Sequence, residues 1–239
     1  MIVATTYAAL AALANVLGGV IVTASVRRNR MMLGLLVAFG AGFMLAVALL
    51  EMLPHGLNAE HGITLVLAGY LAVHLTQHTM TPHFHFGEET HHEAMVSRGI
   101  GGWALAGLLP HAFFDGVAIA GGFLESARLG LLVFGAVLLH KIPTGVSLAS
   151  VMLASGNSSR QAIAAVTVIG LATVVGAGVT PAVGLLADHG LAFAAGVTVY
   201  VAASNLIPES QREPGWRVSG GVFVGVAAFY LLRMLLPTP

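Results

Sequence analysis

Eight long apolar stretches separated by short polar connections fill this chain, and they constrain its fold more than any other feature. A bilayer core of about 30 Å is crossed by roughly 20 apolar residues in a helix. Since 57% of the residues are hydrophobic and only 8% charged, too little polar surface remains to solvate a 239-residue globule. We therefore expect an all-α, polytopic membrane protein. Its eight transmembrane helices are predicted near residues 4–26, 31–53, 62–80, 101–123, 127–153, 161–186, 190–208 and 218–236.

These segments leave no separate soluble domain, so one transmembrane domain is expected over residues 1–239, in the cell (inner or plasma) membrane. The first segment lacks a basic n-region and a small-residue cleavage site, and is interpreted as a retained helix. Eight spans put both termini on one side. Extracytoplasmic termini leave only Arg128 in an external loop. The arginines in or beside cytoplasmic loops are then Arg27, Arg28, Arg30, Arg98, Arg160, Arg212 and Arg217.

Composition also narrows the chemistry. Ten basic and ten acidic residues form no long basic run, so nucleic acid is not an expected partner. The chain has no cysteine, so any metal ligands must be His, carboxylate or Met. The one long connection, residues 81–100, is predicted to be a cytoplasmic, His-rich loop, either collecting metal or simply solvated. Its candidate ligands are His83, His85, His91 and His92.

Ionisable side chains inside the membrane concentrate in the fourth and fifth segments. Each costs about 2.5 to 3.5 kcal/mol on insertion scales, which suggests function. His111 and Asp115 stand four residues apart, on one helical face, as two ligands of one metal would. His140 of the fifth segment offers a third ligand. The competing structural interpretation is an ion pair between Asp115 and Lys141, which leaves both histidines unexplained.

Each of these two segments also contains a proline, Pro110 or Pro143. A proline inside a helix frees the carbonyl four residues earlier, which in a bilayer must find a partner or line a cavity. The prolines either kink their helices or break them, as in the discontinuous helices that form ion sites in transporters.

The two polar motifs resemble those of the ZIP (Zrt/Irt-like) family of divalent metal transporters. The motif HAFFDG at 111–116 is similar to HNxxDG of the family's fourth helix, and HKIPTG at 140–145 is similar to HExPHE or HNxPEG of its fifth. The resemblance implies transport of Zn²⁺, as the substrate, toward the cytoplasm, with Fe²⁺, Mn²⁺ and Cd²⁺ as alternatives. It also implies that the first, fourth, fifth and sixth helices carry the site past a scaffold of the other four. A homodimer fits both the family and the glycine-rich segments.

The family resemblance implies two adjacent metal positions, of which this chain keeps one. The ligands implied for the retained position are Met44, His111, Asp115 and His140. The second position is degraded, because the family's ligands are replaced by Ala112, Lys141, Thr144 and Thr180. We interpret the Lys141 ammonium as standing in for the second cation. Metal binding then requires Lys141 to lose its proton or swing aside.

Toward the outer surface, Glu51 and His55 form either a cation entrance or an ordinary polar end. Asp188 and His189 are expected in an external turn without a specific role. Two other functions remain open. A degraded second site is compatible with a transport-inactive metal sensor. The His/Asp site is compatible with an intramembrane zinc-dependent hydrolase, but no HExxH or similar acid-bearing motif supplies a base, so we expect no enzyme.

Overall fold

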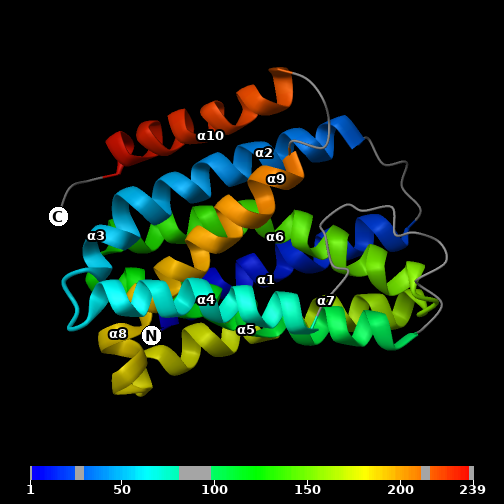
Figure 1. Ribbon diagram of the computed structural model, residues 1–239, viewed down its shortest axis with the longest axis horizontal. Coiled ribbons are helices and arrows are strands. Elements are labelled where there is room, and N and C mark those ends of the chain that lie inside the picture. Colours follow the sequence, from blue (N-terminus) through cyan, green and yellow to red (C-terminus); the bar gives the residue numbers. More distant parts are fainter. Residues whose placement is uncertain (1, 25–29, 81–97, 211–215, 237–239) are drawn as a thin grey trace.

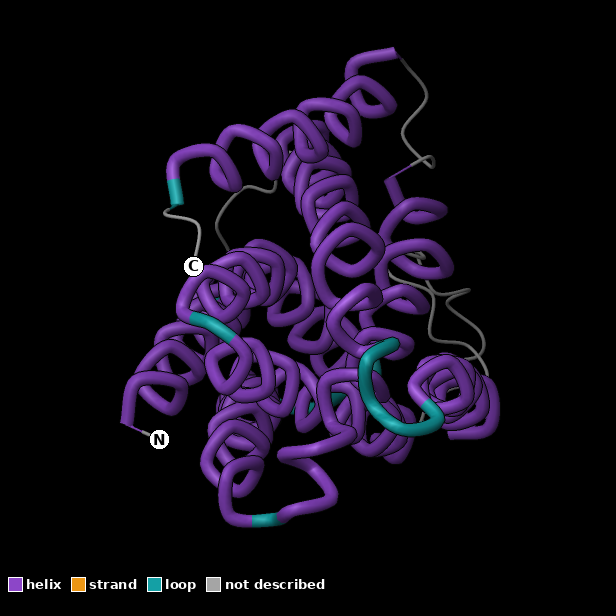
Figure 2. The backbone as a smooth tube through the Cα atoms, turned by 90° about the vertical axis from the view of Figure 1, so that its left-hand side faces the viewer, coloured by secondary structure: helices purple, strands orange, loops and turns teal. Residues whose placement is uncertain are grey.

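The computed structural model describes residues 2–24, 30–80, 98–210 and 216–236, and its regular elements in these ranges are all helices (Figure 2). The all-α prediction is therefore confirmed for this part of the chain. In order, the elements are α1 (Ile2–Thr23), α2 (Arg30–Val47), the π-helix η1 (Ala48–Met52), α3 (Leu53–Gly56), α4 (Gly62–Met80), α5 (Arg98–Glu125), α6 (Ala127–Ala154), α7 (Ser159–Val179), the 3-10 helix η2 (Thr180–Ala182), α8 (Gly184–Tyr200), the π-helix η3 (Val201–Leu206), α9 (Ile207–Ser210) and α10 (Trp216–Leu235).

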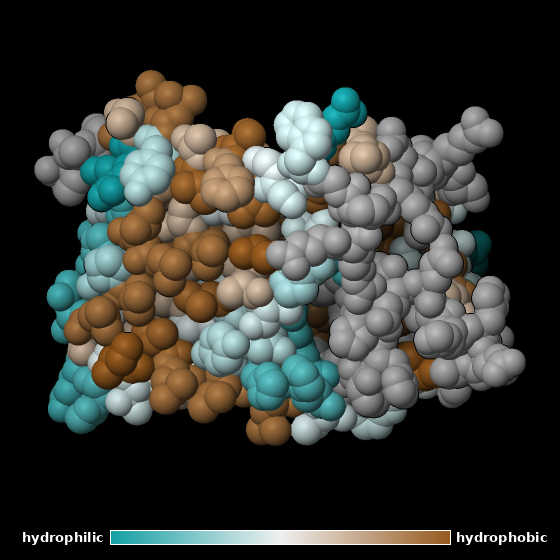
Figure 3. Space-filling model, turned by 45° about the horizontal axis from the view of Figure 1, so that its top comes forward, coloured by the Kyte–Doolittle hydropathy of each residue, from teal (hydrophilic) through white to brown (hydrophobic). Residues whose placement is uncertain are grey.

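Seven stretches of helix within the described ranges are long and apolar enough to cross a membrane. They are Ile2–Thr23, Gly34–Gly56, Gly99–Glu125, Ala127–Ala154, Ser159–Ala182, Gly184–Ser210 and Trp216–Leu235. Apolar side chains cover much of the face seen in Figure 3, as expected for a surface in contact with lipid. The chain is thus a multi-pass membrane protein. The remaining predicted segment forms α4, whose last turns contain His74, Gln77 and His78, and α4 is not among the seven.

The helices pack into two groups. Helices α1, α5, α6 and α7 contact one another, whereas α2 packs with α10 and α4 with α8 (Figure 1). Contacts of α2 with α6 and of α5 with α8 join the two groups. Glycines permit the closest approach between α5 and α7: Gly116 lies against the Thr173 carbonyl, and Gly176 lies against the Phe113 carbonyl. A side chain at either glycine would force these helices apart.

The helix interruptions do not occur at the prolines singled out from the sequence. Helices α5 and α6 run continuously through Pro110 and Pro143, so neither is a broken helix. Instead, π-helical turns directly precede Leu53-Pro54 and Ile207-Pro208. A proline lacks the N–H of the α-helical ladder and its ring clashes with the preceding turn, and a wider π turn accommodates both effects.

The connection between the sixth and seventh predicted segments is also not where the apolar pattern put it. The sequence predicted helix to residue 186 and a turn at 187–189, but α7 ends at Val179 and α8 begins at Gly184. Pro181 lies in the short η2 helix and Val183 is extended, because proline cannot continue the α-helical ladder. Asp188 and His189 therefore lie in the first turns of α8, not in a turn. Elsewhere the helical segments begin and end within three residues of the predicted bounds.

Candidate metal centre

His111 and Asp115 of α5 and His140 of α6 form a buried cluster, with at most 3% of each residue exposed. His111 Nε2 lies 3.4 Å from Asp115 Oδ2, and His140 Nε2 lies 3.3 Å from the same oxygen. Among the described residues, this is the one group of three or more His, Cys, Asp or Glu with metal-ligating atoms all within 4.8 Å of one another. The predicted set of two imidazoles and one carboxylate thus converges on one point, as ligands of a single divalent ion do.

A tight helical hairpin positions these side chains. Helices α5 and α6 are joined by Ser126 alone, whose side-chain oxygen caps α6 by accepting from Leu129 N at 3.1 Å. His111 lies fifteen residues before Ser126 and His140 fourteen residues after it, so both reach nearly the same depth. The helical spacing of four residues then puts Asp115 on the face that carries His111.

The tautomer of His140 follows from its backbone contact. Its Nδ1 lies 3.0 Å from the Ala136 carbonyl oxygen, which can only accept, so Nδ1 carries the proton. In a neutral ring, Nε2 then turns a lone pair toward Asp115 Oδ2. Two acceptors facing each other at this distance need a proton or a metal ion between them. The Nδ1 atom of His111 is buried and has no hydrogen-bond partner in the described part of the chain.

Lys141 reaches the same carboxylate oxygen. Its Nζ donates to Asp115 Oδ2 at 2.7 Å, and the residue is fully buried. The structural ion pair considered from the sequence is therefore present, alongside the two histidines rather than in place of them. Asp115 Oδ2 thus lies within 3.4 Å of one ammonium and two imidazoles.

The other residues that the family resemblance assigned to a second metal position carry neither imidazole nor carboxylate. Ala112 is buried in an apolar cluster. Thr144 Oγ1 donates to the His140 carbonyl at 2.8 Å, and Thr180 Oγ1 donates to the Gly176 carbonyl at 2.7 Å. Both hydroxyl protons are thus used within their own helical turns.

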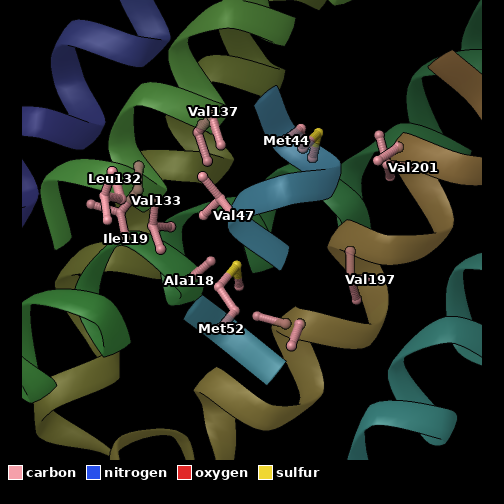
Figure 4. Close-up of a cluster of buried hydrophobic side chains, with 14 of the residues drawn as sticks. Met44, Val47, Met52, Ala118, Ile119, Leu132, Val133, Val137, Val197 and Val201 are labelled. Carbon is pink, nitrogen blue, oxygen red and sulfur yellow. The ribbon is translucent and has the colours of Figure 1, made fainter. Parts of the chain in front are cut away.

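Met44, the remaining predicted ligand, is fully buried on α2 in the larger apolar cluster. Figure 4 shows it among apolar side chains that include Val137 of α6 and Val201 of η3. Gly40 of α2 packs against Leu139, and Phe43 packs against Gly135. Met44 therefore lies about one turn along α2 from the level of His140, and its role as a ligand stays a prediction.

The two predicted entrance residues have different surroundings. The Glu51 carboxylate is 6% exposed and pairs with Arg233 Nε of α10 at 2.7 Å. His55 lines a cavity of about 370 Å³ together with Glu60, Glu125, Asp188 and His189. Sequence reasoning missed the partner of Glu51 and gave Asp188 and His189 no role. The available signal was that acidic and His residues recur near the ends of three pairs of predicted segments. The loop ligands His83, His85, His91 and His92 lie outside the described residues.

Comparison with known proteins identifies relatives. A family model described as ZIP zinc transporter matches residues 72–233. The zinc transporter ZupT of an Enterobacter strain is 29% identical over 96% of this chain and 95% of its own length. The yeast zinc transporter YKE4 is 25% identical over 76% of this chain and 62% of its own length. The human zinc transporter SLC39A7 is 36% identical over 46% of this chain, which spans only 26% of that protein. Because the family model covers about two thirds of the sequence, including both polar motifs, this chain belongs to the ZIP zinc transporter family.

Proposed function

We propose that this protein transports a divalent metal ion, with Zn²⁺ as the principal substrate, through the site formed by His111, Asp115 and His140. The observation that carries the proposal is the convergence of two imidazoles and one carboxylate in a buried cluster, with Nε2 of His111 and of His140 at 3.4 and 3.3 Å from Asp115 Oδ2. Imidazole and carboxylate ligands together suit a borderline divalent cation such as Zn²⁺. The names of the relatives, all zinc transporters, support zinc over Fe²⁺, Mn²⁺ and Cd²⁺.

Lys141 acts in this proposal as the resident cation of the empty site. Its ammonium neutralises Asp115 while no metal is bound, which avoids an isolated buried carboxylate. An arriving ion takes over Asp115 Oδ2, and Lys141 then swings aside or gives up its proton. The lysine thereby lowers the affinity of the site, which favours release of the ion after transport.

The proposed topology has eight spans in a single domain over residues 1–239, with α4 as the eighth span and both termini extracytoplasmic. Exposed Ile63, Leu67 and Leu71 give α4 an apolar outward stripe, which supports its place in the bilayer. In this orientation, the connection between α3 and α4 is external and residues 81–97 are cytoplasmic. The membrane that holds the protein is proposed to be the cell membrane. Helices α1, α5, α6 and α7 carry the site past the other helices, in line with their mutual packing.

The proposal also assigns roles to residues along the transport path outside the central cluster. Met44 supplies a thioether when the site is loaded, His55 and Glu51 lie toward the entrance, and the loop histidines collect zinc on the cytoplasmic side. A homodimer is proposed from the family and from the glycine-rich segments. A transport-inactive sensor is the second candidate, favoured by the absence of imidazole and carboxylate at Ala112, Thr144 and Thr180.

Uptake in proteoliposomes tests the proposal. The protein is reconstituted, and uptake of Zn²⁺, Cd²⁺, Fe²⁺ and Mn²⁺ is compared with that of a His111→Ala, Asp115→Ala variant. Transport through this site predicts zinc uptake by the native protein and background uptake by the variant. Zinc binding without uptake by the native protein would instead support the sensor.

A further inference from the structure

Asn15 of α1 is a fully buried amide of which only the nitrogen is paired. Its Nδ2 donates to the Val166 carbonyl oxygen of α7 at 2.7 Å. Because a carbonyl oxygen only accepts, this contact fixes the other amide atom as Oδ1. That oxygen is buried and has no hydrogen-bond partner among the described residues. Buried acceptors are rarely left unpaired, so Asn15 Oδ1 needs an explanation beyond the packing of α1 against α7.

The contacts of α1 with α6 put Asn15 within about one helical turn of the depth of Lys141. The two helices run parallel, because the rings of Tyr7 and Phe134 lie 4.7 Å apart near the starts of both. About two to three turns further along, Gly145 lies against the Asn15 carbonyl. Lys141 precedes Gly145 by four residues, so both belong to the face of α6 that α1 covers. A helical side chain leans toward the helix N-terminus, which directs Asn15 back toward Lys141.

The Lys141 ammonium needs another acceptor whenever Asp115 binds metal. In the described structure, Lys141 Nζ donates to Asp115 Oδ2 at 2.7 Å. A zinc ion on that oxygen displaces the ammonium, which is fully buried. A buried charge that loses its partner is costly unless a polar group receives it.

We propose that Asn15 is a positioning residue whose Oδ1 accepts the Lys141 ammonium when the transported ion takes over Asp115. The flexible four-carbon stem of lysine permits the swing. Val166, to which Asn15 is tied, packs in the same apolar cluster as Ala112, so Asn15 lies beside the degraded second metal position. This inference rests on the proposed function for the arrival of the ion, and it names the place to which Lys141 moves.

Lys141 is the only lysine in the sequence, so its ammonium can be observed without interference from others. Full-length protein is made by cell-free synthesis with ¹⁵N at lysine Nζ and ¹³C at asparagine Cγ, and solid-state NMR in liposomes measures the coupling between the labels. A hydrogen bond to Oδ1 brings Nζ within about 4 Å of Asn15 Cγ. We expect this coupling to be absent without metal and to appear with zinc. The Asn15→Leu variant assigns it, because the coupling should then vanish.

A second arm of the experiment needs no zinc. In an Asp115→Ala variant the ammonium has lost its carboxylate, so the coupling to Asn15 should appear in metal-free protein. Absence of the coupling in this variant, or in native protein that has bound zinc, would overturn the role of Asn15. The coupling in Asp115→Ala together with no zinc uptake by native protein would refute only the proposed function.

Zinc affinity separates this role from a purely structural one. Asn15→Leu should weaken zinc binding about tenfold in otherwise native protein, because the displaced ammonium stays unpaired. In the Lys141→Met background the same substitution should change the affinity by no more than about twofold, since there is no ammonium to receive. A residue that only ties α1 to α7 would affect both backgrounds alike. Equal losses of affinity in the two backgrounds, measured by calorimetry in nanodiscs, would contradict the proposal.

Discussion

Replacing Lys141 with Met removes the ammonium group that contacts the central carboxylate of Asp115. The Lys141 ammonium lies 2.7 Å from Asp115 Oδ2 in a fully buried position. Methionine has a similar unbranched shape without the charge. The substitution therefore tests whether Lys141 competes with the transported ion for Asp115.

The distance between Lys141 Nζ and a zinc ion on Asp115 determines how much the substitution should raise the affinity for zinc. Zinc binds a carboxylate oxygen at about 2.0 to 2.2 Å, so an ion on Asp115 Oδ2 lies at most about 5 Å from Lys141 Nζ. At an effective dielectric near 20, charges of +2 and +1 at that distance repel by roughly 7 kcal/mol. Because Lys141 can move or lose its proton, only part of this energy opposes binding in the native protein. We expect the Lys141→Met variant to bind zinc at least tenfold more tightly, a gain of about 1.4 kcal/mol or more.

Without metal, the Lys141→Met variant should be less stable than the native protein. Removing one partner of a buried ion pair costs about 3 to 5 kcal/mol, because the other charge stays buried alone. The variant should therefore unfold at lower temperature than native protein in chelator, and zinc should restore much of the loss. Calorimetry and thermal unfolding in nanodiscs measure both effects, with Lys141→Arg as the charge-preserving control. Unchanged or weaker zinc affinity in Lys141→Met would refute the competition between lysine and metal.

Proton release on zinc binding identifies what Lys141 does when the ion arrives. Loss of its proton predicts that native protein releases one more proton per zinc than Lys141→Met. Equal release from the two proteins excludes that route and leaves the swing of the side chain.

Two further predictions concern packing and charge around the site. Asp115→Leu should destabilise the protein by about 3 to 5 kcal/mol by isolating Lys141, and adding Lys141→Met should recover most of the loss; thermal unfolding without recovery would contradict a buried ion pair. Gly116→Ala should destabilise by about 1 to 3 kcal/mol, because a β-carbon there meets the Thr173 carbonyl, whereas Gly102→Ala meets nothing within 4 Å. Equal unfolding temperatures for the two alanine variants would argue against close α5–α7 packing.

The helices and the central cluster could be predicted because their signals are local. An apolar stretch of sufficient length defines a spanning helix, and a spacing of four residues puts His111 and Asp115 on one face. His140 joined them because the hairpin at Ser126 is short enough to equalise their depths. The Lys141 partner was also predictable, since a buried ammonium needs a nearby carboxylate.

Features that depend on contacts between distant segments could not be predicted in the same way. The sequence offered Pro110 and Pro143 as kinks or breaks, but helices α5 and α6 continue through them and π-helical turns precede Pro54 and Pro208 instead. A proline alone does not determine whether a helix bends, continues or widens, because packing against neighbouring helices decides how its freed carbonyl is satisfied.

The surroundings of Glu51 and His189 illustrate the same limit. The ion pair of Glu51 with Arg233 joins residues on α10 and η1 that no local pattern relates. Likewise, the apolar run after Pro181 hid the start of α8, so His189 was assigned to a turn and its place in the cavity was missed.

The central claim is that one zinc ion binds between His111, Asp115 and His140, and X-ray absorption at the zinc K-edge tests it most directly. Protein with His55→Gln, His189→Gln and the four loop histidines replaced by Gln is loaded with one equivalent of zinc. The account predicts two imidazole ligands with oxygen completing the shell, and one imidazole fewer after His140→Ala. A spectrum that His140→Ala leaves unchanged would contradict it.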